Sequence, residues 1–266
     1  MTWHPPEARG FAPLNTYVCR EDDHSLIIDT GISLHTDELL DQLGSLLPPS
    51  PPPAVLHTRI GEYTTISNTA PIAERFGIST IHSEQRDSPR WVDFRPGHGR
   101  DVDRFAALQA ATISLFTVPD TIRVDPGGSR SLDIFHATLR LLPTSWLYDR
   151  RTRTLFTSDV FTHVMRAEPV GPWVVTAGLD DTSVEQVRRH LLATRYWWLA
   201  GAKLEAIRAS IDDTFDRYEV ETIAPDFGCV LHGRDVVRRH VAMLDAVLAE
   251  AQGMAPVPMA RAGANP

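Results

Sequence analysis

The chain has 266 residues, 42% of them hydrophobic, which is enough to bury one sizeable core or two modest ones. Its formal net charge of -8 argues against nucleic acid or an anionic membrane as the main partner. The first ten residues hold no apolar signal-peptide core, and no stretch reaches the ~18 consecutive apolar residues of a membrane-spanning helix. Cys19 and Cys229 are too few for a disulfide framework. We therefore expect a cytoplasmic protein that binds neither nucleic acid nor membrane.

The first elements in chain order form a hairpin followed by a helix. Residues 15–20 and 25–29 are β-rich runs around a polar turn, which predicts two antiparallel strands. Apolar residues then recur at helical spacing, and Thr36 is placed to cap that helix; the apolar positions are Leu39, Leu40, Leu43, Leu46 and Leu47. The proline-rich stretch 48–53 ends the helix as a surface connection.

The remaining pattern alternates short strands and helices in two groups. A strand at 54–58, a helix ending at Gly77 and a strand at 78–82 precede a loop at 83–104. Further strands are predicted at 113–118, 122–124, 132–137, 145–148, 154–157 and 222–224, with helices at 184–215 and 236–249. Two groups of strands with helices outside indicate an α+β fold, a four-layer αββα sandwich in one domain at 1–250 followed by a flexible tail at 251–266.

Five separated strings carry a family resemblance. They are NTY (15–17) with LIIDTG (26–31), LDIFHA (132–137), PTSW (143–146), TLFTSDVF (154–161) and IAPDFG (223–228). In this order they resemble the metallo-β-lactamase superfamily, and specifically its flavodiiron and oxygen-binding diiron branch. The resemblance implies the αββα metallo-β-lactamase sandwich and a tendency to form a homodimer. Flavin is not implied, because the flavodoxin domain often fused after this fold is absent.

The resemblance also implies where metal ligands would stand. In that branch a His-x-Glu-x-Asp-His loop, a later His, a bridging Asp and a final His hold two irons. Counting back from RFG at 75–77, the loop positions fall on Ile60, Glu62, Thr64 and Thr65. The later His falls on Leu141, the bridging carboxylate on Asp159 and the final His on Phe227, so two of the seven ligands remain.

The register of the loop at 59–65 stays open at this point. Starting the motif at His57 keeps one histidine, and starting it at Arg59 keeps none of the ligands. No register restores the motif, and the positions of Leu141 and Phe227 do not depend on the choice.

Isoleucine, leucine and phenylalanine have no lone pair to donate, so we expect no metal and no other cofactor. The alternative is a single iron or zinc held by Glu62 and Asp159, with imidazole help from His57, His163 or His232. His57 lies in an apolar strand, however, where a histidine is more often part of the core.

Without a metal, Glu62 and Asp159 become the candidate catalytic pair. The pocket around them is expected to be lined by Ile60, Thr64, Thr65, Leu141, Phe227 and His163. Burial and mutual repulsion should raise the pKa of at least one carboxylate, as in a general acid/base pair. Glu62 could instead serve only as a helix-start residue. Asp29 is expected to brace the metal loop, and Tyr196 to be a core or dimer contact.

Three functions are consistent with this pattern. The leading hypothesis is a metal-deficient relative of the diiron proteins that binds a small molecule or catalyses a metal-independent reaction. The second is a mononuclear iron or zinc oxidoreductase or hydrolase with a rebuilt ligand set. The third is a non-catalytic regulatory subunit that pairs with a catalytic homologue.

Overall fold

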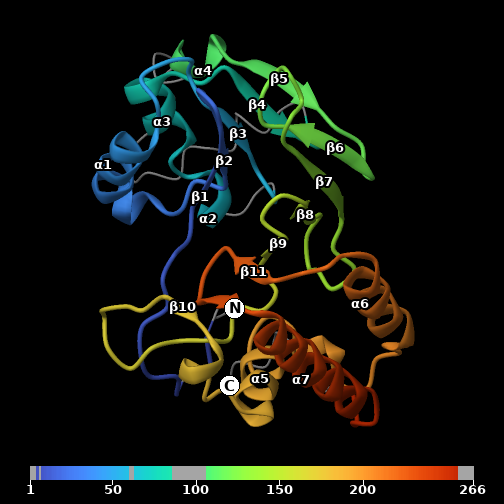
Figure 1. The fold of residues 1–266 in the computed structure, drawn as a ribbon. Coiled ribbons are helices and arrows are strands. Elements are labelled where there is room, and N and C mark those ends of the chain that lie inside the picture. The colour runs from blue at the N-terminus through green and yellow to red at the C-terminus, as the bar shows by residue number, and fades with distance from the viewer. Residues whose placement is uncertain (1–3, 6, 60–62, 86–105, 257–266) are drawn as a thin grey trace, which may run out of the picture.

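The computed structural model describes residues 4–5, 7–59, 63–85 and 106–256, and it shows two β-sheets face to face with helices on both outer sides (Figure 1). The first sheet has the strand order β1-β2-β3-β4-β5, with β1 (Tyr17–Glu21), β2 (His24–Ile28), β3 (Ala54–Leu56), β4 (Thr80–Ser83) and β5 (Thr112–Leu115). Strands β1 and β2 form the predicted hairpin, and β2 to β5 run parallel.

The second sheet has seven strands in the order β10-β12-β11-β9-β8-β7-β6. They are β6 (Asp120–Arg123), β7 (Ser131–His136), β8 (Ser145–Asp149), β9 (Thr154–Ser158), β10 (Val174–Val175), β11 (Thr222–Pro225) and β12 (Val230–His232). Strands β9 and β11 are parallel neighbours although about 70 residues separate them in the chain. Their carboxyl ends therefore meet at one edge of the sheet.

Helices cover the outer face of each sheet. The first sheet carries α1 (Thr36–Leu46), α2 (Tyr63–Ile66), α3 (Thr69–Phe76) and α4 (Ala106–Gln109), and the second carries α5 (Val184–Leu192), α6 (Glu205–Arg217) and α7 (Arg234–Gln252). Three clusters of buried apolar side chains fill the three spaces between the four layers. The αββα sandwich is thus confirmed. Among the described residues, no helix is both long enough and apolar enough to span a bilayer.

The stretch 184–215 was predicted to be helical, but its middle part is not an α-helix. Helix α5 ends at Leu192, a 3₁₀ turn η5 (Trp197–Leu199) follows, and α6 begins at Glu205. Gly201 lies between them at φ 75°, and a Cβ there would come within 2.7 Å of the Pro256 nitrogen. Helix α5 has already ended nine residues before this glycine, which packs closely against the segment after α7.

Three smaller expectations also need correction. Thr36 is the first residue of α1, and its hydroxyl lies 2.6 Å from Asn68 Oδ1 and 2.9 Å from Ser33 O, two acceptors for its hydrogen, and does not cap the helix backbone. Strands β10 and β12 were not predicted, since two or three residues give no readable alternation. Helix α7 continues to Gln252, so residues 251–252 belong to it. Most of the loop at 83–104, and the last ten residues, lie outside the described part.

Candidate functional site

The candidate site is built at the carboxyl ends of strands from both sheets. Asp159 follows β9 directly, and Asp226 follows β11, where the Asp226 amide donates to Ser158 O at 2.8 Å. Arg59 comes three residues after β3. The chain turns sharply here, with Ser158 at φ 50° and Phe161 at φ 66°, both in the left-handed region. Three side chains from distant parts of the sequence are brought to one place by the parallel strands.

The centre of the site is a buried ion pair between Arg59 and Asp159. Arg59 Nη1 lies 3.2 Å from Asp159 Oδ2, and neither side chain has any solvent exposure. Tyr196 donates its phenolic hydrogen to the same oxygen at 2.6 Å, and Arg195 Nη1 is 3.9 Å away. Burial, followed by the charge of Asp159, holds the pKa of Tyr196 well above 10, so the phenol remains a donor. Asp159 is therefore a carboxylate held by a cation and a phenol.

Asp226 is the second buried carboxyl group of the site. Its Oδ2 accepts a hydrogen bond from Thr64 Oγ1 at 3.2 Å. Burial is the main cause that raises the pKa of Asp226 well above its usual value, and the nearby charge of Asp159 raises it further. Both causes favour the protonated form of Asp226. The Oδ1 atoms of Asp159 and Asp226 are both buried without a hydrogen-bond partner.

Asp29 braces the segment that carries Arg59. It accepts from the Thr58 amide at 2.8 Å and from the Thr58 hydroxyl at 2.7 Å, and the same hydroxyl oxygen lies 3.0 Å from Ser158 Oγ. Burial raises the pKa of Asp29 to about 7, against the opposing effect of these bonds. The predicted bracing role matches this geometry.

Several histidines lie close to Phe227 or to one another near it. The Phe227 ring contacts the rings of His4 and His190, at centroid distances of 5.6 and 6.4 Å. His163 Nε2 is 2.8 Å from His240 Nδ1, and His240 Nε2 is 3.3 Å from Asp180. Burial lowers the pKa of His163 well below 6.5 and that of His190 to about 3, so both rings are neutral.

The residues predicted from the family pattern fall in different places. Ile60 and Glu62 lie outside the described residues. Thr65 donates to the Arg59 carbonyl oxygen at 2.7 Å, which places Thr65 next to Arg59. Leu141, by contrast, packs on the apolar cluster under α5 to α7.

The three histidines that could have helped to hold a metal are dispersed. His57 Nε2 is 2.9 Å from Thr69 Oγ1, in a buried contact between the segment after β3 and helix α3. His232 Nδ1 is 2.9 Å from the Thr222 hydroxyl, in an exposed contact between β12 and β11. His163 is engaged with His240. Within the described part of the chain, no group of three His, Cys, Asp or Glu side chains could hold a metal ion.

Sequence reasoning missed Arg59, Tyr196 and Asp226. Arg59 was considered only as a possible first residue of the ligand motif, a start that keeps none of the ligands. It is nevertheless a residue of this segment that contacts Asp159. Asp226 directly precedes Phe227 in the IAPDFG string and was not singled out. For Asp226 the available signal was a charged residue within an otherwise apolar string.

The described residues do not fit a two-iron centre. A guanidinium lies at contact distance from Asp159, to which the family pattern assigns the bridging role, and the buried phenyl ring of Phe227 is at the position to which that pattern assigns the final ligand. Neither group can donate an electron pair to iron.

Solved structures of flavodiiron proteins share this architecture. The flavodiiron protein from Giardia intestinalis superposes with a TM-score of 0.63 at 16% identity, over 91% of this chain and 53% of its own. The rubredoxin oxygen:oxidoreductase from Desulfovibrio gigas gives 0.62 at 14% identity, over 92% and 58%. The chain has the fold of the flavodiiron core.

That core is the metallo-β-lactamase-like domain, and the chain spans about half the length of these two proteins. A fragment (1–254) of a diflavin flavoprotein from Nostoc sp. matches over 91% of this chain and 84% of its own, at 17% identity and a TM-score of 0.62. Identities this low establish the fold alone. No family model and no curated protein matches the sequence significantly.

Proposed function

We propose that this protein works without a metal, as a small-molecule-binding protein or metal-independent enzyme whose Arg59–Asp159 pair stands where flavodiiron proteins have their iron centre. The observation that carries the proposal is the 3.2 Å contact between two side chains with no solvent exposure. A buried carboxylate needs a positive partner, and the guanidinium supplies the charge that a metal would otherwise provide.

Electrostatics opposes metal binding at this carboxylate. An ion bound to Asp159 would lie within a few ångströms of the guanidinium, where two unit charges 4 Å apart repel by about 4 kcal/mol at an effective dielectric constant of 20. A divalent ion would feel about twice that repulsion. Metal binding would therefore require Arg59 to leave a fully buried position.

The pair of carboxyl groups offers acid/base chemistry. Asp226 has a raised pKa, which favours its protonated form, while Asp159 accepts a hydrogen bond from Tyr196 and forms an ion pair with Arg59. A carboxylic acid beside a carboxylate is the arrangement of a general acid/base pair. We assign the acid role to Asp226 and the base role to Asp159, with Glu62 as the further candidate from the loop.

Metal analysis tests the proposal. Protein purified without an affinity tag or chelators is expected to contain well under one iron or zinc ion per chain, and added Zn²⁺ or Fe²⁺ should not raise its melting temperature. The Asp159→Asn variant is the matched control. About one tightly held metal per chain, lost in that variant, would refute the proposal and support the mononuclear alternative.

The ligand and the regulatory alternative need separate measurements. Native mass spectrometry of the purified protein should reveal a retained small molecule, and that mass should be lost or reduced in the Asp226→Leu variant. Co-purification with a ligand-complete homologue, and no bound small molecule, would favour the regulatory subunit instead.

A further inference from the structure

A cavity of about 520 Å³, called here the α1 cavity, lies between the segment 11–16 that precedes β1, helix α1 and the loop that precedes β10. Its volume is within the range of ~300–1,000 Å³ that is usual for small-molecule sites. None of Arg59, Asp159 and Asp226 lines it, so the α1 cavity is separate from the Arg59–Asp159 pair.

The lining of the α1 cavity is mainly apolar. Helix α1 contributes Leu39, Leu43 and Leu46, and the loop before β10 contributes Trp173. Phe11 and Leu46 are 46% and 48% exposed, although both are large apolar residues. A ligand with an apolar body would remove this surface from water, and that burial is the main source of its binding free energy.

The charge of the lining is negative. Among the lining residues that the structure describes, Glu38 is the only Asp, Glu, Lys or Arg, and it takes part in none of the ion pairs found in that part of the chain. Glu38 and its neighbour Asp37 lie in the first turn of α1. Their two negative charges outweigh the partial positive charge of about one half at the start of a helix. A positively charged ligand is therefore favoured over a neutral or an anionic one.

We infer that the α1 cavity is a binding site for a hydrophobic cation, an amine carried on an aromatic or aliphatic body. The apolar body packs against Trp173 and the leucines of α1, and the ammonium group pairs with Glu38. The inference does not rest on the proposed function, because no residue of the Arg59–Asp159 pair takes part in it.

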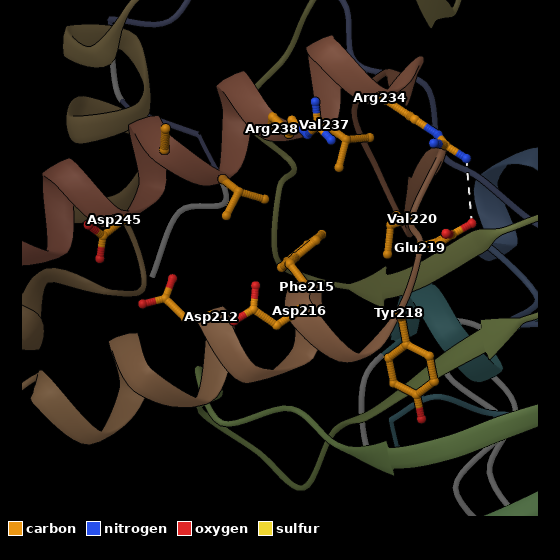
Figure 2. Close-up of a pocket in the computed structure, with 12 residues that line it drawn as sticks. Asp212, Phe215, Asp216, Tyr218, Glu219, Val220, Arg234, Val237, Arg238 and Asp245 are labelled. Carbon is orange, nitrogen blue, oxygen red and sulfur yellow. Dashed lines mark hydrogen bonds and ion pairs between the residues drawn. The ribbon is translucent and has the colours of Figure 1, made fainter.

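The groove between α6 and α7 has a different character (Figure 2). Its volume is about 440 Å³, and charged side chains of both signs line it: Asp212, Asp216, Glu219, Arg234, Arg238 and Asp245. Arg234 pairs with Glu219, and Arg208 donates two hydrogen bonds to Asp245. This mixture of signs favours no one ligand charge, so the groove serves as a control for the α1 cavity.

Asn15 connects the α1 cavity to the segment of Asp226. It lines the cavity, and its backbone amide donates to Asp226 O at 2.8 Å. Its side chain donates to the carbonyl oxygens of Pro225 and Gly228, both at 2.9 Å. A ligand in the cavity therefore lies against a residue that is bonded to both sides of Asp226.

Asn68 connects the α1 cavity to the segment of Arg59. It also lines the cavity, and its side chain donates to Thr30 O at 2.7 Å. The Thr30 hydroxyl donates to Thr65 O at 3.0 Å, and the Thr65 hydroxyl donates to Arg59 O at 2.7 Å. Because both chains of hydrogen bonds start in the lining, we expect ligand binding to be sensed at Asp226 and Thr65.

Isothermal titration calorimetry of the full chain with three indole compounds tests the inference. Tryptamine carries an ammonium group, indole-3-ethanol a hydroxyl group and indole-3-acetate a carboxylate on the same ring system. Tryptamine should bind once per chain and about two- to fivefold more tightly than indole-3-ethanol, and indole-3-acetate should bind most weakly. No saturable binding of tryptamine at millimolar concentrations, or equal affinities for the three compounds, overturns the inference.

Three variants locate the charge that selects the amine. Glu38→Gln should abolish the preference for tryptamine and leave the affinity for indole-3-ethanol unchanged. Asp37→Asn is the matched control, because it removes the same charge from the same helical turn and does not line the cavity. Asp216→Asn makes the same change in the groove of Figure 2. A preference that survives Glu38→Gln, or that is lost in either control, overturns the inference.

Amide chemical shifts in NMR spectra show where the compound binds. Tryptamine should shift the resonances of Asn15 and Gly31 in the lining and, through the hydrogen bonds, that of Asp226. Shifts confined to Val237 and its neighbours would place tryptamine between α6 and α7 and overturn the inference. The proposed function is judged by metal content and by a mass that Asp226→Leu loses, so the failure of one leaves the other to be decided by its own measurement.

Discussion

Replacement of Arg59 by methionine tests the buried ion pair directly. Methionine keeps an unbranched apolar stem in the space of the arginine and removes only the guanidinium. At 3.2 Å and an effective dielectric constant of 20, the attraction between Arg59 and Asp159 is about 5 kcal/mol. This agrees with the ~3–5 kcal/mol by which breaking a buried pair destabilises a protein. We therefore expect urea unfolding at pH 7 to show a loss of that size.

The double variant Arg59→Met/Asp159→Asn separates the pair from the packing. Asparagine still accepts the Tyr196 hydrogen bond but leaves no uncompensated charge, so the double variant should be within about 2 kcal/mol of the natural chain. The control is Arg75→Met, because the Arg75–Asp41 pair is exposed and contributes at most about 1 kcal/mol. Single-variant losses that simply add up in the double variant would refute the reasoning.

Three further predictions concern the surroundings of the pair. Tyr196→Phe removes a buried hydrogen bond to a carboxylate and should lower the free energy of unfolding by about 1.5–3 kcal/mol in urea titrations; an unchanged midpoint would contradict the 2.6 Å contact. The pKa of buried His57 is lowered to about 4, so the unfolded chain takes up this proton near pH 6.5 and the folded chain only near pH 4. Stability should fall with acidification in that window, by up to about 1.4 kcal/mol per pH unit from this residue, and His57→Gln should flatten the slope. Gly228→Ala should destabilise the fold, because a Cβ at φ 82° would come within 2.7 Å of the Thr162 carbonyl oxygen; equal melting temperatures would contradict this.

Much of the fold was readable in the sequence, because local patterns carry it. The hairpin at β1 and β2 follows from two β-rich runs around a polar turn, and most strands of both sheets lie within a few residues of their predicted positions. The sequence strings TLFTSDVF and IAPDFG, near strand ends, also assigned Asp159 and Phe227 to positions that hold metal ligands in the family pattern. The missing electron-pair donor at Phe227 is a property of the residue type and needs no coordinates.

Only the tertiary structure showed which side chains surround Asp159. Arg59 and Asp159 are 100 residues apart, and no local pattern signals that β3 and β9 direct them to the same point. The family pattern did not mark Asp226, whose pKa is raised in the structure because protonation depends on burial and on neighbouring charge. Tyr196 reaches Asp159 from the segment between α5 and α6, within a stretch that the sequence predicted to be mostly helical. Periodicity along a chain reports which face is buried, whereas the partner of a buried charge is set by contacts between elements that the chain order does not reveal.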